Sequence, residues 1–303
     1  MAEDHLPSPP APTIEVCYRH PDVPTRVHCT RCERPICPDC MIPAPVGFQC
    51  PECVAEARRE FRKGPGRPLR GGVSVTKALL VAIAIPFVIE IVVGGPQALF
   101  NPSPELLFDL GAMQPIAVAG GQFWRLLTAM FLHVGLLHVA LNAYFFWLFG
   151  RVVESVYGRT WMLLIYLVAG FLASVASYAF GPVTTLAVGA SGAISGVFGA
   201  FIAYNYRRRH IAANAANLRM ALTVIVLNAV IAFAYRSIDW RAHVGGLVAG
   251  FALGYLADDA VPAGQRRLAR FAGVATLVGV GITLVVWRTV EIRALPGFNE
   301  FFG

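Results

Sequence analysis

The sequence has little charge for its length. Charged residues make up 14% of the 303 positions and hydrophobic residues 56%, which is too apolar for an ordinary soluble domain. Positive charge exceeds negative charge, giving a formal net charge of +7. The basic residues lie mainly in short stretches beside hydrophobic runs, which indicates membrane topology rather than a polyanion-binding face. The lipid bilayer is therefore the expected solvent, and nucleic acid is not an expected partner.

The first residues lack the features of a secretory signal. Segment 1–14 is acidic and rich in proline, without the basic stretch and apolar core that a signal peptide needs. We expect this segment to be disordered and the N-terminus to lie in the cytoplasm. Cysteine is also absent beyond Cys53, because all seven cysteines lie between Cys17 and Cys53. In a cytosolic setting such clustering favours metal thiolates over disulfides.

Residues 15–56 carry metal-ligand pairs. The two members of each pair are separated by two residues, a spacing typical of structural zinc sites. The pairs are Cys17 with His20, Cys29 with Cys32, Cys37 with Cys40, and Cys50 with Cys53. These ligands suffice for two closed tetrahedral sites, and so short a segment depends on metal for most of its folding energy. The sequence predicts a small zinc-binding domain with two structural zinc ions as its cofactors.

The order of these pairs resembles that of B-box or RING-like cross-braced zinc fingers. The resemblance implies an interleaved arrangement, in which one ion is bound by Cys17, His20, Cys37 and Cys40 and the other by Cys29, Cys32, Cys50 and Cys53. Sequential pairing is the alternative, and His28 is an alternative ligand whose spacing fits less well than that of His20. We expect the finger to bind a cytosolic protein partner, and residues 57–72 to form a basic linker.

Long hydrophobic runs fill the chain from Val73 to Trp287. A helix needs about 20 apolar residues to cross a bilayer. Seven runs approach this length, near residues 73–93, 134–153, 160–180, 192–206, 218–235, 243–256 and 268–286. The fourth and sixth are short, which predicts that their first residues lie below the membrane surface and face water. Segment 94–133 is too polar to span, and we expect a partly inserted amphipathic element there.

Lysine and arginine set the expected orientation. They concentrate before the first run and in alternate connections after it, and positive loops face the cytoplasm. An odd number of spans then places the C-terminal tail, residues 289–303, outside. We expect an integral protein of a bacterial plasma membrane, with a cytoplasmic N-terminus.

Two residues in the short runs are candidates for catalysis. Ser191 follows Gly189-Ala190 where a loop enters a helix, so unpaired backbone N–H groups surround its hydroxyl. His243 begins a glycine-rich helix and is the candidate base for such a nucleophile. Small residues around Gly246 and Gly250 would let this helix approach the Ser191 helix closely. No acidic residue is evidently placed to orient the histidine, which favours a dyad.

Polar residues elsewhere in the runs have a functional or a structural explanation. His138 and Asn142 share one helix face and could donate hydrogen bonds to an oxyanion. A lone histidine in a membrane helix is as often a packed, hydrogen-bonded core residue as a catalyst, and stripes of small residues usually mean tight packing. Glu154 fits a structural hydrogen-bonding role, and Glu90 has no evident role.

Taken together, the motifs resemble those of the rhomboid intramembrane serine proteases. They are Trp124-Arg125, His133 with His138 and Asn142, Gly189-Ala190-Ser191-Gly192, and Ala242-His243 followed by Gly245-Gly246. The resemblance implies an all-α polytopic membrane protein, with a rhomboid-like core of six transmembrane helices over residues 73–257. The run at residues 265–288 resembles the seventh transmembrane helix of some members.

The same resemblance implies roles for individual residues. Ser191 attacks the peptide bond, and His243 acts as base and then acid. The oxyanion binds to His138, to Asn142 and to the backbone of the loop from Gly189 to Ser191. Structural roles fall to Trp124, Arg125, His133, Glu154, Gly246 and Gly250. Expected substrates are transmembrane proteins cut near the outer membrane face.

One position departs from the family pattern. Many rhomboid proteases have an aromatic residue four positions after the serine, packed on the histidine, where this chain has Ser195. Phe198 is a candidate replacement. The alternative function is therefore a catalytically weak rhomboid-like protein that binds membrane helices. A transporter would need deeper charges and an internal repeat, and the sequence shows neither.

Overall fold

The computed structural model describes residues 15–44, 46–63, 73–235, 238–258 and 265–298. The chain forms two compact units, Met1–Pro68 and Leu69–Gly303. Segment 1–14, residues 64–72 of the expected linker and residues 299–303 of the expected tail lie outside the described residues. The two units are taken in turn.

The first unit is small and organised around its cysteines. It contains η1 (Pro38–Cys40), the antiparallel strands β1 (Ile42–Pro43) and β2 (Phe48–Gln49), and α1 (Pro51–Lys63). Its buried core consists of cysteines and Ile36, which is fully buried. So few apolar side chains cannot stabilise a domain alone, as the sequence predicts for a metal-dependent fold. Helix α1 runs on from the finger into the expected linker.

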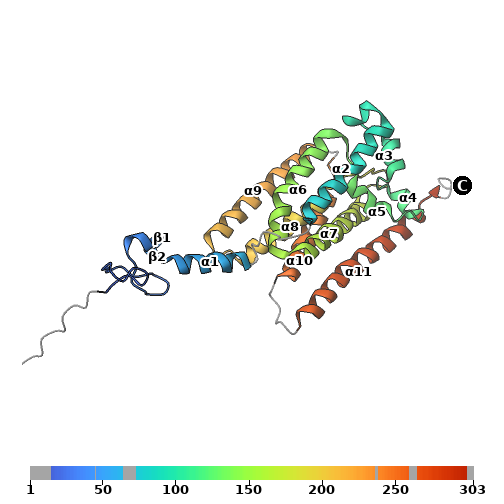
Figure 1. Ribbon diagram of the computed structural model, residues 1–303. Helices are drawn as coiled ribbons and strands as arrows, with labels where there is room; N and C mark the ends of the chain where they lie inside the picture. Colours follow the sequence, from blue (N-terminus) through green and yellow to red (C-terminus); the bar gives the residue numbers. More distant parts are fainter. Residues whose placement is uncertain (1–14, 45, 64–72, 236–237, 259–264, 299–303) are drawn as a thin grey trace, which may run out of the picture. The chain divides into compact units, whose positions relative to one another are not determined.

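The second unit is helical (Figure 1). Its long helices are α2 (Val75–Gly94), α6 (Gly135–Tyr157), α7 (Arg159–Phe180), α8 (Ser191–Arg207), α9 (Ala212–Ala234), α10 (Trp240–Ala257) and α11 (Arg266–Arg293). Among the described residues, α2, α6, α7, α9 and α11 are long and apolar enough to cross a membrane. Helices α8 and α10 have only 17 and 18 residues and correspond to the runs that the sequence marks as short.

Helix α8 packs against α6, α7, α9 and α10 (Figure 1). Its contact with α10 depends on glycine. A Cβ atom on Gly246 would lie 2.0 Å from the carbonyl oxygen of Gly192, and one on Gly250 would lie 1.8 Å from that of Gly196. Both distances are too short for any side chain, so the two backbones touch, as the small-residue pattern predicts.

Short helices form the connection between α2 and α6. They are η2 (Pro96–Leu99), α3 (Pro104–Leu110), α4 (Pro115–Ala119), α5 (Arg125–Thr128) and η3 (Ala129–Phe131). Buried Arg125 holds this segment together, because its guanidinium donates to the carbonyl oxygens of Phe108 and Ala112 at 2.5 and 3.0 Å. The guanidinium also lies over the ring of Trp124, which is itself half exposed.

Helix α11 is fastened to the unit near its C-terminal end. The hydroxyls of Tyr178 on α7 and Thr289 on α11 lie 2.8 Å apart. Arg288 donates to the carbonyl oxygen of Gly181, and Arg293 donates to that of Ala119 at the end of α4. These contacts tie the seventh long helix both to α7 and to the connection that precedes α6.

Candidate active site

Ser191 stands at the junction of a loop and a helix. Gly189 has a φ angle of +126°, and a Cβ atom there would lie 2.9 Å from Cε1 of His138. Only glycine tolerates both the backbone angle and the space. Two residues later Ser191 begins α8, in the first turn where backbone N–H groups have no helical partners. The tight turn thus presents the serine hydroxyl beside unpaired amides.

His243 lies directly against this serine. The Oγ atom of Ser191 and the Nε2 atom of His243 are 2.8 Å apart, although the residues are 52 positions apart in sequence. His243 is in the first turn of α10, and the glycine contact between α8 and α10 brings the two helix starts together. This distance lets the imidazole accept the serine proton.

His138 presents a defined donor to the same region. Its Nδ1 atom accepts a hydrogen bond from the backbone N–H of Val134 at 3.3 Å. An imidazole nitrogen that accepts carries no hydrogen, so the proton of neutral His138 is on Nε2. A Cβ atom on Gly189 would lie 3.0 Å from this Nε2 and 3.6 Å from the serine Oγ. The Nε2–H group and the serine hydroxyl therefore border the same space at Gly189.

Asn142 supplies a second donor one turn further along α6. Its side chain is 7% exposed, and its Nδ2 atom has no hydrogen-bond partner within the part of the chain that the structure describes. Leaving a buried amide unpaired is costly, which favours a role that a substrate completes. Gly189 contributes differently, because its own N–H donates to the carbonyl oxygen of Ala129 at 2.9 Å. Its missing side chain leaves open the space that His138 and Ser191 border.

An acidic residue that the sequence analysis missed stands near the candidate base. Asp239 is the N-cap of α10 and accepts hydrogen bonds from the Ala242 N–H and the Ser177 hydroxyl. An aspartate just before a helical run is an N-cap signal that the sequence offered. Of the hydrogen bonds among described residues, none joins its carboxylate to the His243 ring.

The remaining motif residues lie in separate parts of the second unit. His133 is fully buried beside His138, with ring centroids 5.1 Å apart. Glu154 on α6 accepts hydrogen bonds from Ser74 and from the start of α2, a structural position. Phe198 packs at a tilt against Phe149 and stacks on Phe201 inside the bundle, and no ring contact between Phe198 and His243 is found among the described residues.

The first unit holds two groups of candidate metal ligands. One consists of Cys17, His20, Cys37 and Cys40, and the other of Cys29, Cys32, Cys50 and Cys53. This is the interleaved arrangement, not the sequential one. His28 lies in neither group, since its ring pairs with Glu15.

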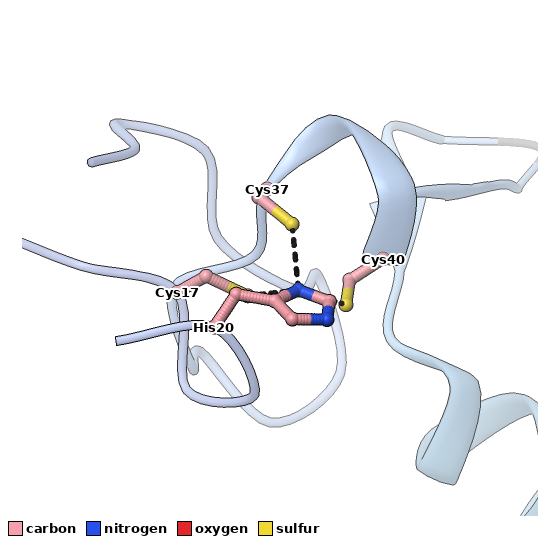
Figure 2. Close-up of side chains that lie close together, drawn as sticks. All are labelled: Cys17, His20, Cys37 and Cys40. Atoms are coloured by element: carbon pink, nitrogen blue, oxygen red, sulfur yellow. Dashed lines mark hydrogen bonds between the residues drawn. The ribbon is translucent and has the colours of Figure 1, made fainter. Parts of the chain in front are cut away.

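The geometry of the first group fits a tetrahedral metal ion. In Figure 2 the Nδ1 atom of His20 faces the sulfurs, and it lies 3.1 Å from Cys37, 3.5 Å from Cys40 and 3.8 Å from Cys17. Ligands around a zinc ion with Zn–S distances of about 2.3 Å are separated by roughly 3.5 to 3.8 Å. The distances to Cys40 and Cys17 lie in this range, and the distance to Cys37 is shorter. The thiolate-rich donor set also matches a structural zinc site.

Arg34 supports the second group, a role that the sequence analysis did not assign. Its Nε atom donates to the Cys32 sulfur at 3.3 Å and its Nη2 atom to the Cys50 sulfur at 3.6 Å. The guanidinium beside Cys32 lowers the pKa of that thiol. Glu52 in turn pairs with the guanidinium at 2.7 Å. Arg34 thereby favours the thiolate form that metal binding requires.

Comparison with known proteins relates the second unit to one family. The protein-family model of the rhomboid domain matches residues 120–258, which include Ser191 and His243. Rhomboid protease GluP of Bacillus subtilis is 34% identical over 228 residues, covering 73% of this chain and 43% of the relative. The putative rhomboid protease YdcA of the same bacterium is 32% identical over 141 residues, covering 46% of this chain and 70% of the relative.

A plant protein shows the same likeness. RHOMBOID-like protein 6, mitochondrial, of Arabidopsis thaliana is 36% identical over 158 residues, covering 52% of this chain and 51% of the relative. The alignment with GluP spans less than half of that protein's length. The two groups of candidate metal ligands, between Cys17 and Cys53, lie outside the matched rhomboid domain.

Proposed function

This chain belongs to the rhomboid family, and from that premise we propose that it is an intramembrane serine endopeptidase with Ser191 as nucleophile and His243 as general base. The observation that carries the proposal is the 2.8 Å approach of Ser191 Oγ to His243 Nε2. A serine is a weak nucleophile alone and needs an adjacent base of this kind.

The mechanism follows from the positions of the donors. His243 Nε2 takes the hydroxyl proton as Ser191 Oγ attacks the scissile carbonyl carbon. The carbonyl oxygen becomes an oxyanion and accepts hydrogen bonds from His138 Nε2–H, Asn142 Nδ2–H and the Ser191 N–H. The C–N bond then breaks, and the imidazolium protonates the departing amine. Water, deprotonated by His243, hydrolyses the acyl-enzyme and regenerates the serine.

The surroundings of the serine support membrane proteins as substrates. The candidate site lies at the starts of α8 and α10, which pack among helices long enough to cross a membrane. We infer that a substrate is a transmembrane protein cut near the outer face. The charge pattern supports a cytoplasmic N-terminus, an outer C-terminus and, in a bacterium, the plasma membrane.

The parts of the chain divide accordingly. In this proposal residues 73–257 are the six-helix protease core, 265–288 add a seventh transmembrane helix and 289–303 form an outer tail. Residues 15–56 hold two structural zinc ions through the ligand groups described above and bind a cytosolic protein. Residues 57–72 serve as a basic linker between the two parts.

The direct test is labelling of the detergent-solubilised protein with a fluorophosphonate probe. We expect the wild type to be labelled and Ser191→Ala and His243→Ala to be unlabelled, with Ser195→Ala as a matched serine control that keeps the label. A folded wild type that takes up no label would overturn the protease proposal. It would favour the helix-binding alternative, for which the absence of an aromatic residue at Ser195 is the supporting observation.

A further inference from the structure

Glu90 is a buried acid for which the sequence offers no role. It lies four residues before the end of α2 and is fully buried. Its Oε1 atom accepts a hydrogen bond from the backbone N–H of His133 at 2.9 Å, across 43 positions of sequence. Its Oε2 atom has no partner among the described residues. Burying a carboxyl group with an unpaired oxygen is costly, so packing alone is a poor reason for it.

The peptide that Glu90 holds leads directly to the candidate oxyanion site. His133 N–H binds Glu90, and the next amide, Val134 N–H, binds His138 Nδ1 at 3.3 Å. The two amides belong to successive peptide planes joined at the His133 Cα, so anchoring the first amide limits where the second can lie, through the φ and ψ angles of one residue. The second bond is the one that keeps the His138 proton on Nε2, beside Gly189 and Ser191.

A second contact joins the same segment to His138. The rings of His133 and His138 meet edge to face, with centroids 5.1 Å apart and planes at 72°. Both ring nitrogens of His133 lack a hydrogen-bond partner among the described residues, so its backbone N–H is its bond to α2. Glu90 thus holds the backbone of His133, whose ring packs against His138.

We propose that Glu90 is a positioning residue for the oxyanion site. It holds the His133–Val134 segment so that Val134 N–H fixes the tautomer of His138 and aims its Nε2–H at the oxyanion. This inference rests on the proposed function, because it concerns the same oxyanion.

Glu154 provides a matched control. It too is a buried glutamate that binds α2, through the N–H groups of Val75 and Thr76 and the hydroxyls of Ser74 and Thr76. Glu154 binds the first turn of α2 from α6, whereas Glu90 belongs to α2 itself and lies near its last turn. A general loss of α2 packing should affect variants at both positions alike, while loss of His138 orientation should affect only those at Glu90.

The first experiment is a double-mutant cycle on cleavage of a transmembrane peptide. We expect Glu90→Leu and Glu90→Asp to lower kcat about 10- to 100-fold with little change in KM. Glu90→Gln should keep most activity, because its amide oxygen still accepts the His133 N–H. In a His138→Ala background, Glu90→Leu should cause no further decrease in kcat. Glu154→Leu should lower Tm, and it should change kcat by the same factor with and without His138→Ala. Equal losses from Glu90→Leu in both backgrounds would overturn the proposal.

The second experiment does not depend on activity. Nuclear magnetic resonance of ¹⁵N-histidine protein, with His138→Gln to assign the signal, reports which ring nitrogen carries the proton. We expect the Nε2–H form in the wild type and Glu90→Gln, and a mixture in Glu90→Asp or Glu90→Leu. An unchanged tautomer in folded Glu90→Asp would overturn the role of Glu90. Failure of fluorophosphonate labelling in the wild type would instead overturn the proposed function.

Discussion

The donors around Ser191 differ in how they are held. The backbone N–H of Val134 donates to His138 Nδ1, and this hydrogen bond places the proton of His138 on Nε2. Asn142 is buried, and its amide nitrogen has no partner within the described part of the chain. An unpaired donor binds more strongly to a developing negative charge than to a neutral carbonyl. At the scale of single residues, Asn142 should therefore act on the transition state more than on substrate binding.

Replacing Asn142 by alanine tests this expectation. We expect Asn142→Ala to lower kcat by about 10² to 10³ with KM nearly unchanged, as loss of one oxyanion donor does. Kinetics with a transmembrane peptide substrate measures both constants. The control is Asn205→Ala, since Asn205 is buried near the other end of α8 and binds Asn214 and Asn217. That variant should lower Tm, and an increase in KM alone for Asn142→Ala would contradict the donor role.

The contact between α8 and α10 determines whether the candidate dyad forms. Their backbones touch at Gly192 with Gly246 and at Gly196 with Gly250. Ser191 and His243 lie at the starts of these same two helices. Any increase in the separation of the helices is therefore expected to lengthen the distance from Oγ to Nε2.

Adding a single methyl group at the contact between α8 and α10 tests this expectation. Gly250→Ala would place a Cβ atom 1.8 Å from the Gly196 carbonyl oxygen. We expect destabilisation of about 3 kcal/mol, together with loss of fluorophosphonate labelling. The control is Gly279→Ala on α11, where a Cβ atom meets nothing within 4 Å. Alanine there should be neutral or stabilising by roughly 0.5 to 1 kcal/mol, and a labelled, stable Gly250→Ala protein would refute the prediction.

At the scale of the whole molecule, the two units depend on different forces. The first has a core of cysteines with little apolar surface, whereas the second buries a large cluster of aliphatic and aromatic side chains. A domain of the first kind unfolds without its metal. The second contains no comparable group of metal ligands within the residues that the structure describes.

Removal of metal should therefore unfold the first unit and leave the second unit folded. We expect a strong chelator to release two zinc ions per chain and to make residues 15–63 sensitive to protease, while fluorophosphonate labelling of Ser191 persists. Metal release is measured with a chromogenic dye and cleavage by mass spectrometry. Cys37→Ser, which removes one ligand, should reproduce the effect for one ion. Loss of labelling together with the metal would show that the units are coupled.

The sequence by itself determined the class of solvent, the residue types at the candidate sites and the pairing of adjacent metal ligands. These features depend on composition and on short spacings, which are set locally. Only the tertiary structure decided which distant pairs of candidate metal ligands lie together, that Ser191 meets His243, and that Glu90 reaches His133. The contacts of Arg34 with the thiols were likewise found only there, whereas Asp239 carries an N-cap signal that is readable in the sequence. Such contacts depend on how helices and loops pack, and helix periodicity says which face is apolar but not which partner covers it.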